Sequence, residues 1–249
     1  MQERYFKFST GEMAYYIIGT GKPIVILHGW GQSFFSFKSI VDELKNEYQI
    51  IGIDFLGFGL SDEPSNPLKI CDYSFQVKTL LGFLEIENPI IIGHSFGGRI
   101  AIDYAADLPV EKLILVSSAG IKHWSLKRSI KVLKYKLLKN TYKIFSKKKL
   151  EALRSKSGSR DYLNASPVMK KTLSNIIKYS SKSDLKKVKS KTYLLWGIKD
   201  EETKYSDALI MKNLLKNSVI IPFYESGHFC YLEEKDKFIR ELKNILKEK

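Results

Sequence analysis

The chain has 249 residues, of which 44% are hydrophobic and 27% are charged, and it contains 16 glycines. These proportions are those of a globular domain with a sizeable core, so they exclude a disordered chain, a collagen and a small disulfide-stabilised protein. The apolar runs have the length of strands and fall well short of the roughly 20 residues that span a bilayer. The N-terminus lacks the layout of a secretion signal and two cysteines are too few for a disulfide framework, so a cytoplasmic protein is expected.

The net charge of +14 is concentrated in the middle of the chain. Residues 121–191 contain 22 Lys or Arg residues and three acidic residues, which gives +19, whereas the rest of the chain carries −5. Such a segment either has a solvated basic surface or attracts an anionic partner. This change of composition predicts a core formed by residues 1–120 and 192–249, and a basic helical cap at residues 121–191.

Short β-branched runs alternate with longer amphipathic stretches outside the basic segment, a pattern typical of a mostly parallel sheet covered by helices. Eight strands are expected at residues 5–8, 13–18, 24–27, 49–54, 89–93, 112–117, 192–196 and 218–223. Helices are expected near residues 36–48, 73–84, 96–106, 206–215 and 233–248. A short turn joins the first two strands, so the sheet should begin antiparallel and continue parallel. The basic segment has helical periodicity and would be inserted after the sixth strand.

A serine lies at the turn between the most apolar predicted strand and the helix that follows it. Residues 93–97 read Gly-His-Ser-Phe-Gly. Glycines on both sides of Ser95 would let neighbouring backbone approach closely, as a sharp strand-to-helix turn requires. An inert serine in a tight turn is the alternative interpretation. The context of strand and helix favours Ser95 as a nucleophile.

A serine nucleophile needs a base to take its proton and an acid to orient that base. His228 follows the last predicted strand, and α/β sheets place ligand-facing groups at the carboxyl ends of their strands. His94 adjoins Ser95, but its side chain is expected to point away from the turn. His28 is expected to hold a loop by hydrogen bonds, and His123 lies in the basic segment. The sequence therefore predicts His228 as the base.

The acid should come from a neighbouring strand end. Asp200 lies just beyond the predicted strand at residues 192–196, so its carboxylate could meet His228. Three further acids are close enough in sequence to compete: Glu201, Glu202 and Asp207. With Asp200 as the acid, the chain order is nucleophile, acid and base.

Attack by Ser95 on a carbonyl group would create a negative oxygen that needs N–H donors. One donor is expected to be the amide of Phe96, at the start of the helix. The other is expected to be the amide of Trp30, in the His-Gly-Trp-Gly loop at residues 28–31. The candidate substrate-binding residues are Gly29, Trp30, Trp124 and Phe229.

Five motifs, in this order and spacing, resemble the α/β-hydrolase superfamily. They lie at residues 28–31, 54–62, 93–98, 196–200 and 227–228, and the likeness runs from about residue 6 to the C-terminus. The resemblance implies the α/β-hydrolase fold, a catalytic triad of Ser95, Asp200 and His228, and an oxyanion hole made by the amides of Trp30 and Phe96. It also implies a helical cap over residues 121–191. Leu56 replaces a proline that is common in such loops, which puts no catalytic residue in doubt.

The expected activity is that of a serine hydrolase that cleaves a carboxylic ester or thioester through an acyl-serine intermediate. Haloalkane dehalogenases use aspartate at the turn, so Ser95 argues against that class. Carbon–carbon bond hydrolases resemble the core motifs, although many carry a tryptophan where this chain has Phe229. Acyltransferases, perhydrolases and non-catalytic ligand receptors on the same fold stay open as alternatives, because fold alone decides little about substrate.

The basic segment raises the question of a partner. The loop at residues 28–31 is similar to that of esterases that act on pimeloyl methyl ester bound to acyl carrier protein, an acidic partner. A basic cap would suit such a carrier or a CoA thioester, although lysine is also an ordinary solvated surface residue. No metal-ligand spacing, dinucleotide fingerprint or P-loop is present, so no metal or cofactor is expected. The segment has no nucleic-acid recognition motif, so no specific nucleic-acid partner is expected.

Overall fold

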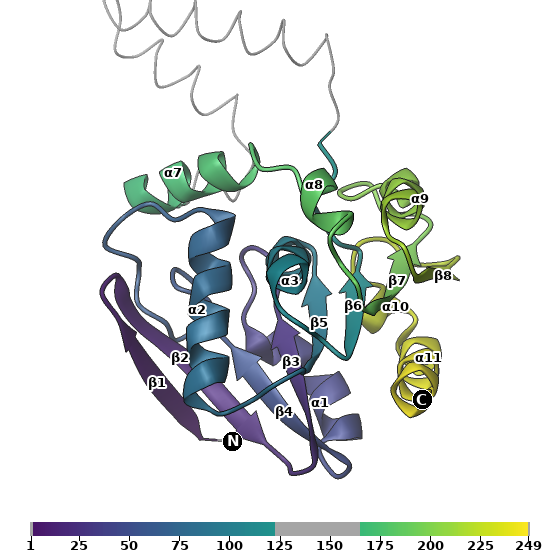
Figure 1. The fold of residues 1–249 in the computed structure, drawn as a ribbon, viewed down its shortest axis with the longest axis horizontal. Coiled ribbons are helices and arrows are strands. Elements are labelled where there is room, and N and C mark those ends of the chain that lie inside the picture. Colours follow the sequence, from purple (N-terminus) through teal and green to yellow (C-terminus); the bar gives the residue numbers. More distant parts are fainter. Residues whose placement is uncertain (1, 123–164, 249) are drawn as a thin grey trace, which may run out of the picture.

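A computed structural model describes residues 2–122 and 165–248 (Figure 1). Within these residues, the strands form one eight-stranded sheet with the order β1-β2-β4-β3-β5-β6-β7-β8. The strands are β1 (Glu3–Phe8), β2 (Gly11–Ile18), β3 (Lys22–Leu27), β4 (Tyr48–Ile53), β5 (Ile90–His94), β6 (Lys112–Val116), β7 (Lys191–Gly197) and β8 (Ser218–Phe223). Strand β2 is antiparallel to β1 and β4, and the other pairs are parallel. The predicted sheet with an antiparallel start is therefore confirmed.

Helices cover both faces of the sheet (Figure 1). The described helices are α1 (Lys38–Leu44), α2 (Ile70–Phe83), α3 (Phe96–Asp107), α7 (Pro167–Ile176), α8 (Lys182–Leu185), α9 (Tyr205–Leu214), α10 (Cys230–Glu233) and α11 (Lys235–Lys247). Helices α2, α3 and α9 pack on one face, and α1 and α11 pack on the other. This is the α/β-hydrolase arrangement that the sequence resemblance implied.

Strand β3 shows why its sequence is a continuous apolar run. Its side chains alternate between the two faces of the sheet. Val25 and Leu27 join the apolar cluster that contains α2 and α3, whereas Ile24 and Ile26 join the cluster that contains α1 and α11. All four side chains are fully buried. A strand buried on both faces needs apolar residues at every position, which hides the alternation from the sequence.

Helices α7 and α8 lie in the chain between β6 and β7, where the cap was expected. In space α7 lies beyond the end of α2, and α8 lies beside α3 (Figure 1). The segment is tied to the core at Thr172 of α7, whose Oγ1 accepts a hydrogen bond from the N–H of Leu68 at 3.0 Å. Residues 123–164 of the predicted cap lie outside the described residues. The structure thus contains a helical insertion after β6, while the exact limits of the cap stay a prediction.

Two predicted helices have different limits in the structure. The helix expected at residues 36–48 is a 3₁₀ turn (Phe34–Phe37) followed by α1, which ends at Leu44. The helix expected at residues 233–248 begins earlier and is divided into α10 and α11. The division falls at Glu234, whose backbone is not helical (φ −119°, ψ 51°) and whose carboxylate accepts a hydrogen bond from the side chain of Ser226. Helical periodicity alone does not show such a break.

Two further expectations concern the compartment of the protein. Among the described helices, none combines the length and the apolar character needed to cross a membrane. Both cysteines are free thiols: Cys71 is exposed and Cys230 is buried. The cytoplasmic location stays a prediction.

Candidate active site

Ser95 occupies the strained turn that its sequence context predicts. It joins β5 to α3 with φ 50° and ψ −110°, a left-handed φ that side chains rarely adopt. Its N–H donates to the carbonyl oxygen of Val116 at 3.1 Å, and its own carbonyl accepts from the N–H of Ala119 at 3.0 Å. Val116 ends β6 and Ala119 follows it, so the neighbouring strand holds the turn in place. Ser95 is half-buried at the carboxyl edge of the sheet.

The glycines that flank Ser95 are required by close backbone contacts. A Cβ atom on Gly97 would lie 2.2 Å from the carbonyl oxygen of Leu27, and one on Gly93 would lie 2.8 Å from the carbonyl oxygen of Gly97. Real Cβ atoms do not approach backbone so closely. Helix α3 can therefore begin against the end of β3 only if these two positions carry no side chain. This is the reason for the glycines that the sequence analysis gave.

The residues predicted as acid and base lie in hydrogen-bond contact. His228 Nδ1 is 2.9 Å from Asp200 Oδ2, and both side chains are buried. The N–H groups of Glu202 and Thr203 donate to the other carboxylate oxygen of Asp200, each at 2.9 Å. Burial alone would raise the pKa of Asp200, but its hydrogen bond with His228, the charge of that ring and the bonds from Thr203 together lower it. The structure thus holds Asp200 as a carboxylate that can orient an imidazole.

The structure also separates Asp200 from the acids that competed with it. Glu202 lies on the other side of the ring, with its carboxylate 3.5 Å from His228 Nε2 and its side chain 68% exposed. Glu201 is exposed, and Asp207 is buried in α9. The sequence did not indicate that Glu202 faces the free nitrogen of the ring.

Thr203 is a member of the site that the sequence analysis missed. Its hydroxyl lies 2.8 Å from Asp200 Oδ2, 3.0 Å from the carbonyl oxygen of Ser117 and 3.3 Å from His228 Nδ1. It therefore connects the acid to the end of β6. The signal available in the sequence was a threonine three residues after an aspartate, a spacing at which an aspartate side chain accepts from the backbone of a turn.

Ser95 and His228 lie on adjacent segments. His94, the residue before Ser95, has its Nε2 3.0 Å from the carbonyl oxygen of His228, and the two imidazole rings are 4.8 Å apart. Both Ser95 and His228 are among the described residues, and no hydrogen bond joins the serine hydroxyl to the ring of His228. In structures without substrate, catalytic hydrogen bonds are often long and tighten on binding.

The other two described histidines have structural surroundings, as expected. His94 is buried and its Nδ1 lies 2.9 Å from Gln32 Oε1, away from the nucleophile. His28 Nδ1 donates to the carbonyl oxygen of Gly29 at 2.7 Å, and its Nε2 accepts from the N–H of Phe55 at 3.1 Å. Burial lowers the pKa of His94 to about 3 and that of His28 to about 4. Both rings are therefore neutral at neutral pH, and His28 joins the loops after β3 and β4.

The predicted oxyanion donors come from the loop after β3 and from the start of α3. In the hydrogen bonds of the described residues, the N–H groups of Trp30 and Phe96 have no acceptor, whereas the N–H of Gly29 donates to Gln32 Oε1 at 2.9 Å. The rings of Trp30 and Phe96 pack edge to face with centroids 5.6 Å apart. Two unused donors therefore lie on neighbouring segments beside the turn at Ser95.

A cleft of about 420 Å³ opens beside this loop. Its described lining residues are Trp30, Gly31, Gln32, Gly57, Phe58, Gly59, Glu63, Ala165, Ser166 and Met169. Of the predicted substrate-binding residues, Trp30 lines the cleft and Gly29 lies in the same loop. Phe229 instead packs against the rings of His94 and His228. Trp124 lies outside the described residues.

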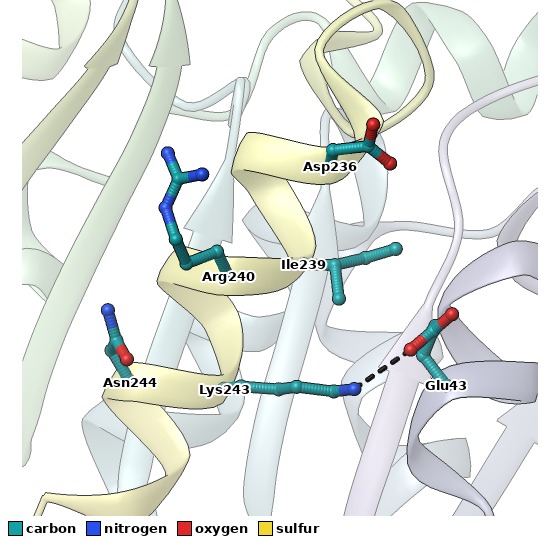
Figure 2. A pocket seen from close by; sticks show the side chains of 6 residues that line it. All are labelled: Glu43, Asp236, Ile239, Arg240, Lys243 and Asn244. Carbon is teal, nitrogen blue, oxygen red and sulfur yellow. Dashed lines mark hydrogen bonds and ion pairs between the residues drawn. The ribbon is translucent and has the colours of Figure 1, made fainter.

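A second groove lies between α1 and α11, away from these residues (Figure 2). Figure 2 shows Glu43 of α1 and Lys243 of α11 paired across it. The distance between Glu43 Oε2 and Lys243 Nζ is 2.8 Å. It is lined by Glu43, Asp236, Ile239, Arg240, Lys243 and Asn244. None of the predicted site residues lines this groove, so we do not regard it as the candidate active site.

Comparison with known proteins agrees with this fold. The profile of a family described as alpha/beta hydrolase fold matches residues 22–156. The chain therefore belongs to the α/β-hydrolase fold family. It is 31% identical, over 88% of this chain and 90% of the relative, to the AB hydrolase superfamily protein YisY of Bacillus subtilis.

Other relatives differ in their reactions. The chain is 23% identical, over 92% of its length and 90% of the relative, to a 2-hydroxy-6-oxo-2,4-heptadienoate hydrolase of Pseudomonas putida. Among solved structures, an esterase from Exiguobacterium antarcticum superposes with a TM-score of 0.76 at 25% identity, and 96% of each chain is covered. A bromoperoxidase from Bacillus anthracis has a TM-score of 0.80 at 21% identity, covering 99% of this chain and 100% of the other, and shows the fold alone. Membership of the family supports a hydrolase.

Proposed function

We propose that this protein is a serine hydrolase that cleaves a carboxylic ester or thioester. The observation that carries the proposal is the hydrogen bond between His228 Nδ1 and Asp200 Oδ2, next to the strained turn at Ser95. A base oriented by a carboxylate, beside a serine on a sharp strand-to-helix turn, is the arrangement that activates a hydroxyl for attack.

In the proposed reaction, His228 Nε2 takes the proton of the Ser95 hydroxyl while its oxygen forms a bond to the substrate carbonyl carbon. The amides of Trp30 and Phe96 donate to the resulting oxyanion. The carbon–oxygen or carbon–sulfur bond then breaks, and the protonated His228 gives its proton to the departing alcohol or thiol. Water, deprotonated by His228, attacks the acyl-serine and releases the acid, which regenerates Ser95.

The acyl group would lie in the cleft beside Trp30. This cleft has aromatic side chains, with Trp30 and Phe58 packed edge to face at 4.8 Å, and one charged residue, Glu63, among its described lining residues. A cleft with aromatic side chains and few charged groups favours a neutral acyl chain. We therefore favour an ester with an uncharged acyl group.

A carbon–carbon bond hydrolase is the second candidate, because the chain is similar over most of its length to a 2-hydroxy-6-oxo-2,4-heptadienoate hydrolase. The name of that relative denotes a carboxylate-bearing dienoate as its substrate. Side-by-side assays of a p-nitrophenyl ester and of that dienoate separate the two candidates, since each reaction releases a product with its own absorbance.

We also propose that the basic cap attracts an anionic carrier of the acyl group, such as an acidic acyl carrier protein or CoA. The described part of the cap, residues 165–191, contains eight lysines and one aspartate, a net charge of +7. Six of the lysines are exposed: Lys171, Lys178, Lys182, Lys186, Lys187 and Lys189. Lys171 lies in α7 and Lys182 in α8, and the other four lie in the segments that follow these helices. Ala165, Ser166 and Met169 of the same part of the chain border the cleft. A dense positive field there would raise the local concentration of an anionic substrate.

The proposed function is tested by labelling with a fluorophosphonate probe and by hydrolysis of p-nitrophenyl esters from acetate to laurate. We expect stoichiometric labelling of the wild-type protein at Ser95, a burst of p-nitrophenol and loss of both in Ser95→Ala. Ser118→Ala is the matched control, because Ser118 follows the neighbouring strand and is not proposed to react. Absence of labelling and of burst in the wild-type protein would favour a ligand receptor.

A further inference from the structure

The loop that carries His228 is held by two adjacent carboxylates at the junction of α10 and α11. Glu233 Oε2 accepts from the N–H of Gly227 at 2.6 Å, and Glu233 Oε1 lies 3.3 Å from the N–H of Phe229. The residues immediately before and after His228 therefore donate to the two oxygens of one side chain. Glu234 Oε2 accepts from the N–H of Glu225 at 3.0 Å.

The carbonyl group of His228 is fixed from the opposite side. His94 Nε2 lies 3.0 Å from this oxygen, and His94 is buried. The peptide groups around His228 are thus anchored by Glu233 on the solvent side and by His94 on the core side. The imidazole itself is anchored by Asp200 at Nδ1.

These anchors matter because Asp200 alone leaves the ring free to turn. A single hydrogen bond at Nδ1 permits rotation about the line that joins Nδ1 to the carboxylate, and such rotation moves Nε2. The carboxylate of Glu202 lies 3.5 Å from Nε2, so another partner competes for this nitrogen. Catalysis needs Nε2 to face the Ser95 hydroxyl closely, and displacement by about 1 Å can cost on the order of 10²-fold in rate.

We propose that Glu233 is a positioning residue that holds the backbone around His228, so that Nε2 faces Ser95. The inference deepens the proposed function and rests on it, because it assigns His228 the role of the base. Glu233 touches no reacting atom and acts through the N–H groups of Gly227 and Phe229. Its carboxylate is exposed, so water competes for its hydrogen bonds and the expected effect is smaller than that of a buried anchor.

A role limited to helix capping is the alternative. Glu233 lies at the end of α10, and Phe229 is the residue that precedes this helix. Capping alone would change the stability of the protein and would leave the turnover number of the folded protein unchanged. A four-residue helix also offers little structure to stabilise. The two roles therefore predict different kinetics.

The first experiment compares Glu233→Ala and Glu233→Gln with a control on α11, Glu241→Gln. Glutamine keeps one oxygen acceptor and nearly the same size, so it should restore part of the function. For hydrolysis of p-nitrophenyl butyrate, we expect Glu233→Ala to lower kcat about tenfold with KM within about twofold of wild type. Glu233→Gln should lose about threefold, and Glu241→Gln should behave as wild type. An unchanged kcat, or a fall that matches the lost folded fraction in thermal unfolding, would overturn the proposal.

The second experiment does not depend on catalysis. Proteins with ¹⁵N-labelled histidine give an Nδ1–H signal for His228, assigned by its loss in His228→Gln. We expect this signal to shift or broaden in Glu233→Ala and to stay in place in Glu241→Gln, because the ring becomes mobile only in the first variant. An unchanged signal in Glu233→Ala would refute positioning. If the wild-type protein neither hydrolyses esters nor reacts with fluorophosphonate, the proposed function fails, while this signal still decides the role of Glu233.

Discussion

Arg99 of α3 donates from Nη1 to the carbonyl oxygen of Tyr179 at 2.9 Å and to that of Ile176 at 3.0 Å. Ile176 ends α7 and Tyr179 follows it, at a place where the last carbonyl groups of a helix lack intrahelical donors. The side chain of Tyr179 donates in turn to Asp103, one turn further along α3, at 2.8 Å. The helix that begins after Ser95 therefore also anchors the chain that returns from the insertion.

This anchor predicts a large effect for Arg99→Met. The change keeps the length of the side chain but removes the Arg99 hydrogen bonds to both carbonyl groups, of which that of Ile176 keeps a bond from the N–H of Tyr179. It should lower the free energy of unfolding by about 1–3 kcal/mol. Burial lowers the pKa of Arg99 only to about 10, so the charge is present at neutral pH and is lost in the variant. Urea denaturation measures the effect. Arg240→Met is the control, since that side chain is 63% exposed, and equal losses in both variants would contradict the anchor.

The carboxylate of Asp200 should be needed for the tautomer of His228. In Asp200→Asn the amide can donate to Nδ1, which would leave the proton on Nε2, where a lone pair must take the serine proton. We expect kcat for ester hydrolysis to fall on the order of 10⁴-fold. Glu201→Gln removes a neighbouring exposed carboxylate and should change kcat less than about twofold. Comparable losses in the two variants would show that Asp200 is not the acid.

The buried neutral histidines predict acid sensitivity. Burial lowers the pKa of His28 to about 4 and that of His94 to about 3, whereas in the unfolded chain both take up protons near pH 6.5. Between these values the unfolded state binds more protons, so the free energy of unfolding should fall as the pH drops below about 6.5. Each histidine contributes up to about 1.4 kcal/mol per pH unit.

Urea denaturation at about pH 7, 6 and 5 measures this dependence. Asp200 acts only at lower pH: because its folded pKa is lowered, its contribution is present above its unfolded value of about 3.9 and is lost as the pH falls through the folded value. A free energy of unfolding that stays constant from about pH 7 to pH 5 would contradict the neutral buried rings.

Replacement of two glycines in different surroundings by alanine should change the stability of the protein in opposite directions. In Gly97→Ala the new Cβ atom would lie 2.2 Å from the carbonyl oxygen of Leu27, so α3 must shift away from β3. We expect a loss of at least about 3 kcal/mol in stability and a strong loss of activity. Gly82 lies in α2 with no atom within 4 Å of such a Cβ, so Gly82→Ala should stabilise the protein by about 0.4–1 kcal/mol. Thermal unfolding of both variants checks the pair, and a neutral Gly97→Ala would contradict the packing of the turn.

The anionic-carrier proposal predicts a charge effect that depends on the substrate. Reversal of three exposed lysines, Lys182, Lys186 and Lys189, to glutamate should raise KM for an acyl-CoA or acyl-carrier substrate about tenfold. It should leave KM for p-nitrophenyl butyrate unchanged, because that ester is neutral. Reversal of Lys212, Lys216 and Lys235 on the core is the control. Equal KM values for carrier-bound substrate in both triple variants, without any effect of salt, would show that the basic cap recruits nothing.

Much of this fold follows from local patterns. The apolar runs of β3, β5 and β6 are long enough for strands and too short for membrane helices, and amphipathic stretches separate them. The turn at Ser95 could also be predicted, because the glycines on both sides of it lie within five consecutive residues. Such glycines indicate a place where backbone segments approach each other closely. The first and last residues of the helices are harder to predict from the sequence. The break at Glu234 depends on hydrogen bonds to Glu225 and Ser226, which are eight or nine residues away, and no periodicity records them.

The amino-acid order by itself determined the sheet, its helical cover and the identity of Ser95, Asp200 and His228 as candidates, because these depend on strand ends and on residue types that chemistry requires. Tertiary structure decided which acid meets the ring. Asp200, Glu201 and Glu202 are consecutive, yet Asp200 lies at Nδ1 and Glu202 faces Nε2. It also brought Thr203, His94 and Glu233 to the same histidine. Such contacts join segments whose distance in space is set by the packing of the whole sheet, and short-range sequence patterns carry no information about that distance.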